Sequence, residues 1–239
     1  MKNIGLKIKG LPEVKHLFDA KTYKRMINDA LEETAKKAKV ELQEEMTRVF
    51  DRPTRWTLTR PYFIRHFNNL SIEWKLRDLK ADEYLWPHIE GGSREQKGSE
   101  KYLQKIAGVG HKVYWVPGAG VKLNKYGNVS GGQITQILSV LKALPEVGYL
   151  GNITERSKRR AEHRVKKPKP PREFFIAKGH SRLHPGVWEK VKHGRIRPIL
   201  LFIKDPQYSE RLDFYGTIAN SFKKHLQGRL NIQVEELNR

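Results

Sequence analysis

The chain has 239 residues, of which 31% are charged and 38% hydrophobic, a composition that permits a globular core. No apolar run approaches the ~18 residues of a membrane-spanning helix, the N-terminus lacks the pattern of a secretory signal, and the absence of Cys excludes disulfides and thiolate metal sites. The 47 Lys and Arg against 26 Asp and Glu give a net charge of +21, which favours an acidic partner: nucleic acid, a protein surface or anionic lipid.

The first predicted element is a helix that begins at its N-cap, Thr22, and runs to about Arg48. Its apolar or small positions follow spacings of three and four, which predicts one face that packs against other elements. These positions are Tyr23, Met26, Ile27, Ala30, Leu31, Thr34, Ala38, Leu42 and Met46. Pro53 and Pro61 then break helical structure, so the segment FDRPTRWTLTRPYF is predicted to be a loop or an irregular strand.

Two strands are predicted next. From Leu70 to Arg77 apolar and polar residues alternate, as in a half-buried strand. The segment YLWPHIEGG, residues 84–92, predicts an edge strand, because Pro87 removes one ladder donor and the two glycines allow a tight reversal. Strand edges are where subunits pair, so the following residues are predicted to form an oligomer interface: Tyr84, Trp86, Ile89 and Glu90.

Residues 91–130 are rich in Gly and predict loops, interrupted by a helix at 99–106 and a short strand at KVYWVP. Ser130 followed by Gln133 has the spacing of a capping box, and the helix it opens is predicted to stop at Pro145. Residues 154–172 follow, with nine Lys or Arg against two Glu, and predict a segment that becomes ordered only in an assembly.

Two strands and a helix close the chain. FFIAKG and RPILLFIK predict strands that pair with each other as a long antiparallel hairpin. A last helix carries the apolar stripe Tyr215, Ile218, Ala219, Phe222, Leu226 and Leu230, with Asp213 as its cap.

Several patterns that imitate catalytic or ligand sites have simpler interpretations. His180 and His184 have the spacing of a zinc pair, but Gly and Pro border them and no acid completes a ligand set, so loop histidines are favoured. Glu73 and Lys75 resemble half of a nuclease metal site, and a solvent-facing charge pair is favoured. The glycines of GVG, GAG and SGG match no phosphate-binding motif. The sequence therefore predicts no catalytic site, metal or cofactor.

The basic segment is the one predicted ligand site. Its residues would neutralise phosphates of DNA without reading sequence, or meet carboxylates of an acidic protein. Aromatic residues for base stacking are absent, so base recognition is not indicated. The protein partner is favoured over DNA, and a free flexible loop is the remaining alternative. The predicted contacts are Arg156, Lys158, Arg159, Arg160, Arg164, Lys166, Lys167, Lys169 and Arg172.

Three segments resemble the tail-component and tail-completion proteins of long-tailed bacteriophages, including the minor tail protein Z group. They are the opening IKGLPEVKHL with its Ala-containing helix, YLWPHIEGG, and RPILLFI followed by LDFYGTIANSFKKHL, which together cover roughly residues 4–92 and 172–230. The resemblance implies a structural protein of the virion, assembled in the host cytoplasm. Several copies would form a ring at the neck or tail end, in contact with other neck, tail or portal proteins and with no membrane.

We therefore expect one α+β domain over residues 1–239, with an insertion at 93–171. A small, mostly antiparallel sheet would carry the long N-terminal helix and the C-terminal helix, and Trp56, Trp86, Trp115 and Trp188 would be interface anchors. The alternatives are a basic nucleic-acid-binding protein outside any virion and, third, a metal-dependent nuclease.

Overall fold

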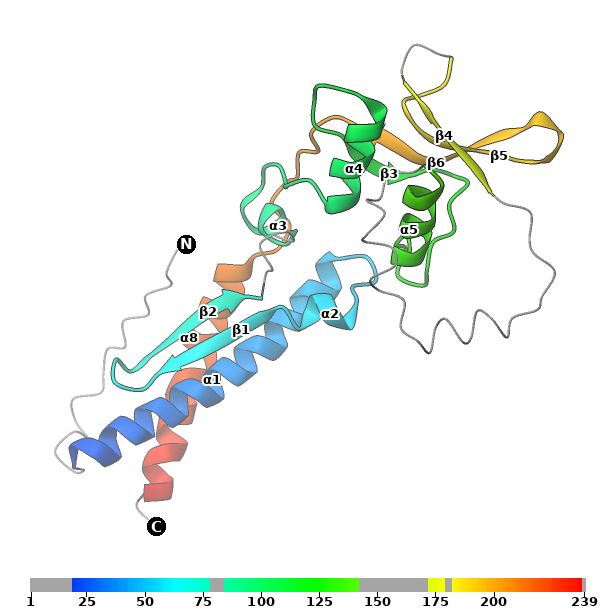
Figure 1. Ribbon diagram of the computed structural model, residues 1–239. Helices are drawn as coiled ribbons and strands as arrows, with labels where there is room; N and C mark the ends of the chain where they lie inside the picture. Colours follow the sequence, from blue (N-terminus) through cyan, green and yellow to red (C-terminus); the bar gives the residue numbers. More distant parts are fainter. Residues whose placement is uncertain (1–18, 78–83, 142–171, 179–181, 238–239) are drawn as a thin grey trace, which may run out of the picture. The chain divides into compact units, whose positions relative to one another are not determined.

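The computed structural model describes residues 19–77, 84–141, 172–178 and 182–237 (Figure 1). Its helices and antiparallel sheets, with a long helix near each end of the chain, confirm the predicted α+β class. The chain divides into two compact units. We call Met1–Gly91 with Ser209–Arg239 the helical unit, and Gly92–Tyr208 the sheet unit.

The helical unit is built on α1 (Ala20–Val49), whose boundaries lie close to the prediction. Thr22 is not its cap. The carboxylate of Asp19 accepts from the backbone N–H groups of Lys21 and Thr22, and the Thr22 hydroxyl donates to the same carboxylate at 2.6 Å. An acidic cap also suits the positive end of the helix dipole. The predicted apolar face is buried at Met26, Ile27, Ala30, Leu31, Ala38, Leu42 and Met46.

The C-terminal helix α8 (Phe214–Leu237) runs antiparallel beside α1 (Figure 1). Its predicted cap is confirmed, because Asp213 accepts from the backbone N–H of Gly216 at 2.8 Å. Its buried stripe packs into the α1 core: Ile218, Phe222, Leu226 and Leu230. Glu41 also joins the helices through polar contacts, because its Oε1 lies 2.8 Å from His225 Nε2 and 4.0 Å from Lys224 Nζ.

A hairpin also packs on α1. It consists of β1 (Pro61–His66) and β2 (Ser71–Leu76), paired so that Phe63 lies opposite Trp74. The alternation predicted the second strand correctly. The prediction of a loop or an irregular strand at residues 50–63 holds for 50–54 and 59–60, and β1 begins at Pro61. It missed the helical turn α2 (Arg55–Leu58), which the Thr54 hydroxyl caps by accepting from the Thr57 N–H at 3.1 Å.

The predicted edge strand at 84–90 is wrong. Residues Trp86–Glu90 form the short helix α3, with Pro87 in its first turn. A helix's first turn has no use for the N–H that Pro lacks, so Pro fits there as well as at a strand edge. Gly91 ends the helix with φ 73°, a conformation that glycine adopts without strain.

The sheet unit has four antiparallel strands in the order β3-β6-β5-β4. They are β3 (Tyr114–Pro117), β4 (Glu173–Ala177), β5 (Gly186–Lys190) and β6 (Ile196–Ile203), and the 3-10 turn η2 (Lys192–Gly194) connects the last two. The predicted pairing of β4 with β6 is wrong, because β5 lies between them. The sheet unit therefore contains the predicted insertion, residues 93–171, together with the three strands that follow it, β4, β5 and β6.

Two helices pack on one face of this sheet: α4 (Gly98–Ala107) and α5 (Gly131–Val140), both predicted. Ser130 caps α5 by accepting from the Gln133 N–H at 3.4 Å, while Pro145 lies outside the described residues. The helices and strands share one core, made of Leu103, Ile137, Leu138, Phe174, Val187, Ile199 and Leu200.

A buried ion pair joins α4 to the segment before it, and its carboxylate also accepts a hydrogen bond from β3. Glu100 has no exposed surface and accepts from the Arg94 guanidinium at 2.6 and 2.7 Å. The same carboxylate accepts from the backbone N–H of Lys97 at 2.7 Å and of Trp115 at 3.3 Å. Gly92 and Tyr208 exchange two backbone hydrogen bonds, of 3.0 and 2.8 Å, so the two ends of the sheet unit lie together. Across the parts of the chain described, no helix combines the length and apolar character that crossing a membrane requires.

Candidate interaction surfaces

The predicted oligomer interface lies in and just before α3, inside the helical unit. Ile89 is buried in the core of this unit, and Trp86 packs against the same core. Tyr84 stacks on Trp56, with ring centroids 5.6 Å apart, and Glu90 is exposed. Ile89, Trp86 and Tyr84 thus pack in or against the core of the helical unit. The role of the four residues in an oligomer interface stays a prediction.

Most of the predicted basic contacts lie outside the described residues. These are Arg156, Lys158, Arg159, Arg160, Arg164, Lys166, Lys167 and Lys169, and the same holds for His180. Arg172 is described, immediately before β4, and its guanidinium donates to the Glu189 carboxylate. Its charge is therefore engaged inside the sheet unit.

Glu189 is the centre of a small ionic cluster that the sequence patterns did not indicate. It is only 4% exposed, and it accepts from Arg172 Nη2 at 2.9 Å and from Arg197 Nε at 2.7 Å. Burial alone would raise the pKa of Glu189, but the hydrogen bonds from Arg172 and Arg197 outweigh it and hold the pKa below its ordinary value. The cluster ties the start of β4 to β5 and β6.

Glu73 and Lys75 form the surface charge pair that was favoured, with Lys75 Nζ 3.0 Å from Glu73 Oε1. His66 Nε2 lies 3.0 Å from the other carboxylate oxygen. These hydrogen bonds, first from His66 and then from Lys75, lower the pKa of Glu73. Within the described part of the chain no three His, Asp or Glu side chains gather as metal ligands would.

The four predicted tryptophan anchors have different surroundings. Trp56 is 46% exposed and carries the Arg60 guanidinium 4.0 Å above its ring. Trp86 packs on the helical core, and Trp115 packs against the helix-covered face of the sheet. Trp188 is half-buried on the opposite face, where its Nε1 donates to the backbone oxygen of His184 at 3.0 Å.

This opposite face, which we call the outer face, carries apolar residues in register. Side chains directly opposite each other in an antiparallel ladder share a face. Phe175, Trp188 and Pro198 therefore form one row across β4, β5 and β6. Leu201 and Val116 lie in the next row, and Ile196 lies on the other side of Trp188. Val116 is 38% and Ile196 41% exposed, so this face presents apolar surface to its surroundings.

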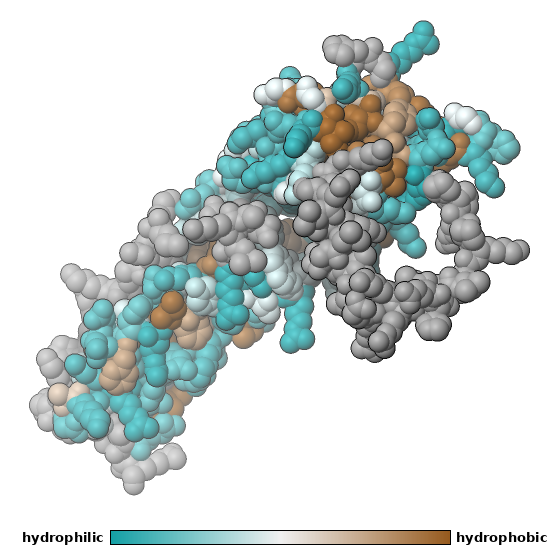
Figure 2. All heavy atoms as spheres, in the orientation of Figure 1, coloured by the Kyte–Doolittle hydropathy of each residue, from teal (hydrophilic) through white to brown (hydrophobic). Residues whose placement is uncertain are grey.

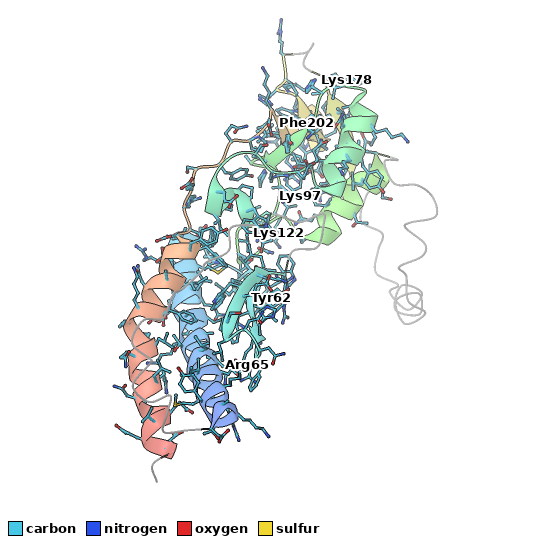
Figure 3. All side chains as sticks on the ribbon, turned by 90° about the vertical axis from the view of Figure 1, so that its left-hand side faces the viewer. Tyr62, Arg65, Lys97, Lys122, Lys178 and Phe202 are labelled. Carbon is cyan, nitrogen blue, oxygen red and sulfur yellow. The ribbon has the colours of Figure 1, made fainter. Side chains whose placement is uncertain are left out.

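A groove of about 610 Å³ lies at the end of the same sheet. Its walls are mostly apolar, with Val109 and Val113 from the segment after α4 and Phe202 and Ile203 from the end of β6. Basic side chains complete the lining: Lys178, Lys204, His111 and His184. Figure 3 shows Lys178 and Phe202 in the same part of the sheet unit, and in Figure 2 apolar atoms gather over this unit with hydrophilic atoms around them.

No protein-family model matches the chain, and neither a curated protein nor a solved structure matches it.

Proposed function

We propose that this chain is a non-enzymatic structural protein of a phage virion, present in several copies that form a ring at the neck or the tail end. Such a ring would complete the tail or join it to the head. The resemblance of the opening segment and of the closing segment to phage tail-completion proteins supports this function, whereas YLWPHIEGG, which the resemblance likens to a strand end, forms α3. The segment RPILLFI followed by LDFYGTIANSFKKHL forms β6, a connection and α8, in the order strand then helix that the resemblance implies.

The observation that carries the proposal is the apolar groove at the end of the sheet. Val109, Phe202 and Ile203 are only partly buried there and lie together, and contiguous exposed apolar surface is typical of interaction sites. A side chain or short segment of a neighbouring copy would fill the groove, and burying its apolar walls would contribute to association. A groove on one surface that receives a different surface of the next copy forms a ring when the rotation between copies closes, and an open filament when it does not.

The state of association tests this proposal. Nuclease-treated protein should sediment as species whose masses are multiples of 27.9 kDa as its concentration rises. Val109→Lys at the groove should weaken association by about tenfold or more, because a neighbouring copy would have to cover a charge that Lys178 and Lys204 repel rather than pair. The matched control is Val40→Lys on α1, where Val40 is 53% exposed. A monomer at every concentration, or equal effects of the two variants, would contradict the proposal.

The surroundings of Glu73 support the non-enzymatic part. Its carboxylate already has two cationic or hydrogen-bonding partners on its own hairpin, His66 and Lys75. We expect no Mg²⁺-dependent cleavage of DNA. Cleavage by the parent protein that both Glu73→Ala and Lys75→Ala abolish would instead establish the nuclease alternative.

A further inference from the structure

The positive charge of this protein is concentrated in the sheet unit. Residues 92–208 contain 24 Lys and Arg against 8 Asp and Glu, whereas the rest of the chain contains 23 against 18. Two of the acids in the sheet unit, Glu100 and Glu189, are buried and paired with arginines. They add no negative potential at the surface that would offset the exposed bases. The surface of this unit is therefore suited to a polyanion.

Exposed bases lie in the turns at both ends of the outer face. The turn between β4 and β5 carries Lys178 and Arg182, and the turn between β5 and β6 carries Lys192 and Arg195. Neither turn contains an acidic residue. Because β5 has five residues, the two turns lie roughly 17 Å apart, a span that an extended nucleic-acid strand crosses within a few nucleotides.

Aromatic side chains lie between these two basic turns. Phe175 and Trp188 are directly opposite each other on adjacent strands, and Trp188 is on a central strand of the sheet. The bond from Trp188 Nε1 to the His184 backbone satisfies the polar edge of the indole and holds the ring in place. Bases stack on such side chains only when they are unpaired, and stacking of this kind tolerates any sequence.

We propose that the outer face of the sheet unit binds single-stranded nucleic acid. Lys192 and Arg195 at one end, and Lys178 and Arg182 at the other, contact phosphates, while Phe175 and Trp188 stack on bases between them. The inference does not depend on the virion function, because it concerns a surface of the isolated chain. It also differs from attachment through residues 154–172, since it places the aromatic contacts on β4 and β5.

Fluorescence anisotropy with a labelled oligothymidine of about 20 nucleotides, and with a duplex of the same length, tests the proposal. The parent protein should bind the single strand more tightly than the duplex. Trp188→Leu should weaken single-strand binding by about tenfold and leave duplex binding unchanged, because only unpaired bases stack. Phe175→Leu provides a second variant should Trp188→Leu fail to fold, as judged by circular dichroism. Trp56→Leu, in the helical unit, is the matched control.

A charge-reversal pair tests the phosphate contacts. Lys192→Glu with Arg195→Glu should weaken binding of both oligonucleotides and flatten the dependence of affinity on salt. Lys24→Glu with Lys37→Glu makes the same change in net charge on exposed positions of α1, and should have little effect. Equal effects of the two pairs, or of Trp188→Leu and Trp56→Leu, would overturn the proposal. So would self-association through the outer face that Trp188→Leu abolishes while binding of the single strand is unaffected.

Discussion

Arg94 and Glu100 show how much a single buried pair can matter in a strongly basic chain. Glu100 is fully buried, and the Arg94 side chain is 10% exposed. Removing the arginine leaves a carboxylate without its counter-ion in the interior, so Arg94→Met should lower the free energy of unfolding by about 3–5 kcal/mol. Urea unfolding measures this change.

A surface pair provides the control for that measurement. Arg48 is bonded to Glu45 at 2.6 Å, but its side chain is 76% exposed. The Glu45 side chain is 17% exposed and still reaches water, unlike that of Glu100. Arg48→Met should therefore cost less than about 1 kcal/mol, because solvent screens the pair. Losses of similar size in the two variants would contradict our account of the buried pair.

Glu189 should make the sheet unit sensitive to acid. Its pKa in the folded protein is lowered, so its contribution to stability is present above the pKa of an unfolded Glu, about 4.3, and is lost as the pH falls through the folded value. Near neutral pH, Glu189→Gln should therefore melt at a lower temperature than the parent. The difference in melting temperature should shrink as the pH falls below about 4. A difference that stays constant or grows on acidification would show that the charge of Glu189 is not responsible.

At the scale of elements, periodicity predicted α1, β2 and α8, because each turns one regular apolar stripe toward the helical core, buried in the two helices and partly buried in β2. Sequence patterns gave the wrong element where one residue is compatible with two kinds of secondary structure. Pro87 fits a strand edge and a helix's first turn equally, and only the burial of Leu85 and Ile89 in the helical core selects α3. The patterns also missed β5, because a charged residue such as Glu189 is expected to face solvent. In the fold Glu189 is buried, and Arg172 and Arg197 from two other segments pair with it.

Gly228 offers a way to stabilise α8. It lies on the exposed side of the helix, and a Cβ added there would meet no atom within 4 Å. Gly228→Ala should raise the free energy of unfolding by about 0.5–1 kcal/mol, because alanine loses less backbone entropy in a helix. Thermal or urea unfolding would detect the gain, and a loss of stability would mean that this side of α8 is covered by a partner or by another part of the chain.

Gly186 is the contrasting case in β5. A Cβ at this position would lie 2.3 Å from the backbone oxygen of Leu200, on the neighbouring strand. Gly186→Ala should therefore destabilise the protein by about 1–3 kcal/mol, since the strands must separate to admit the methyl group. Unchanged stability in this variant would contradict the close approach of β5 and β6.

At the scale of the whole molecule, the sequence predicted the class and the terminal helices, but not the division into two units. That division depends on long-range pairing of β3 with β6, which local patterns do not reveal. Because Gly92 and Tyr208 are hydrogen-bonded to each other, residues 92–208 expressed alone should fold and unfold cooperatively, as followed by circular dichroism. An unfolded fragment would show that the sheet unit needs the helical unit.

We propose that this chain is a component of a phage virion at the neck or tail end. The most direct measurement is immunogold labelling of purified virions of the phage that encodes the chain, using an antibody against it. We predict gold particles at one end of the tail or at its junction with the head, on nearly every particle. Absence of the label from virions, in a lysate where the free protein is readily detected, would contradict the claim.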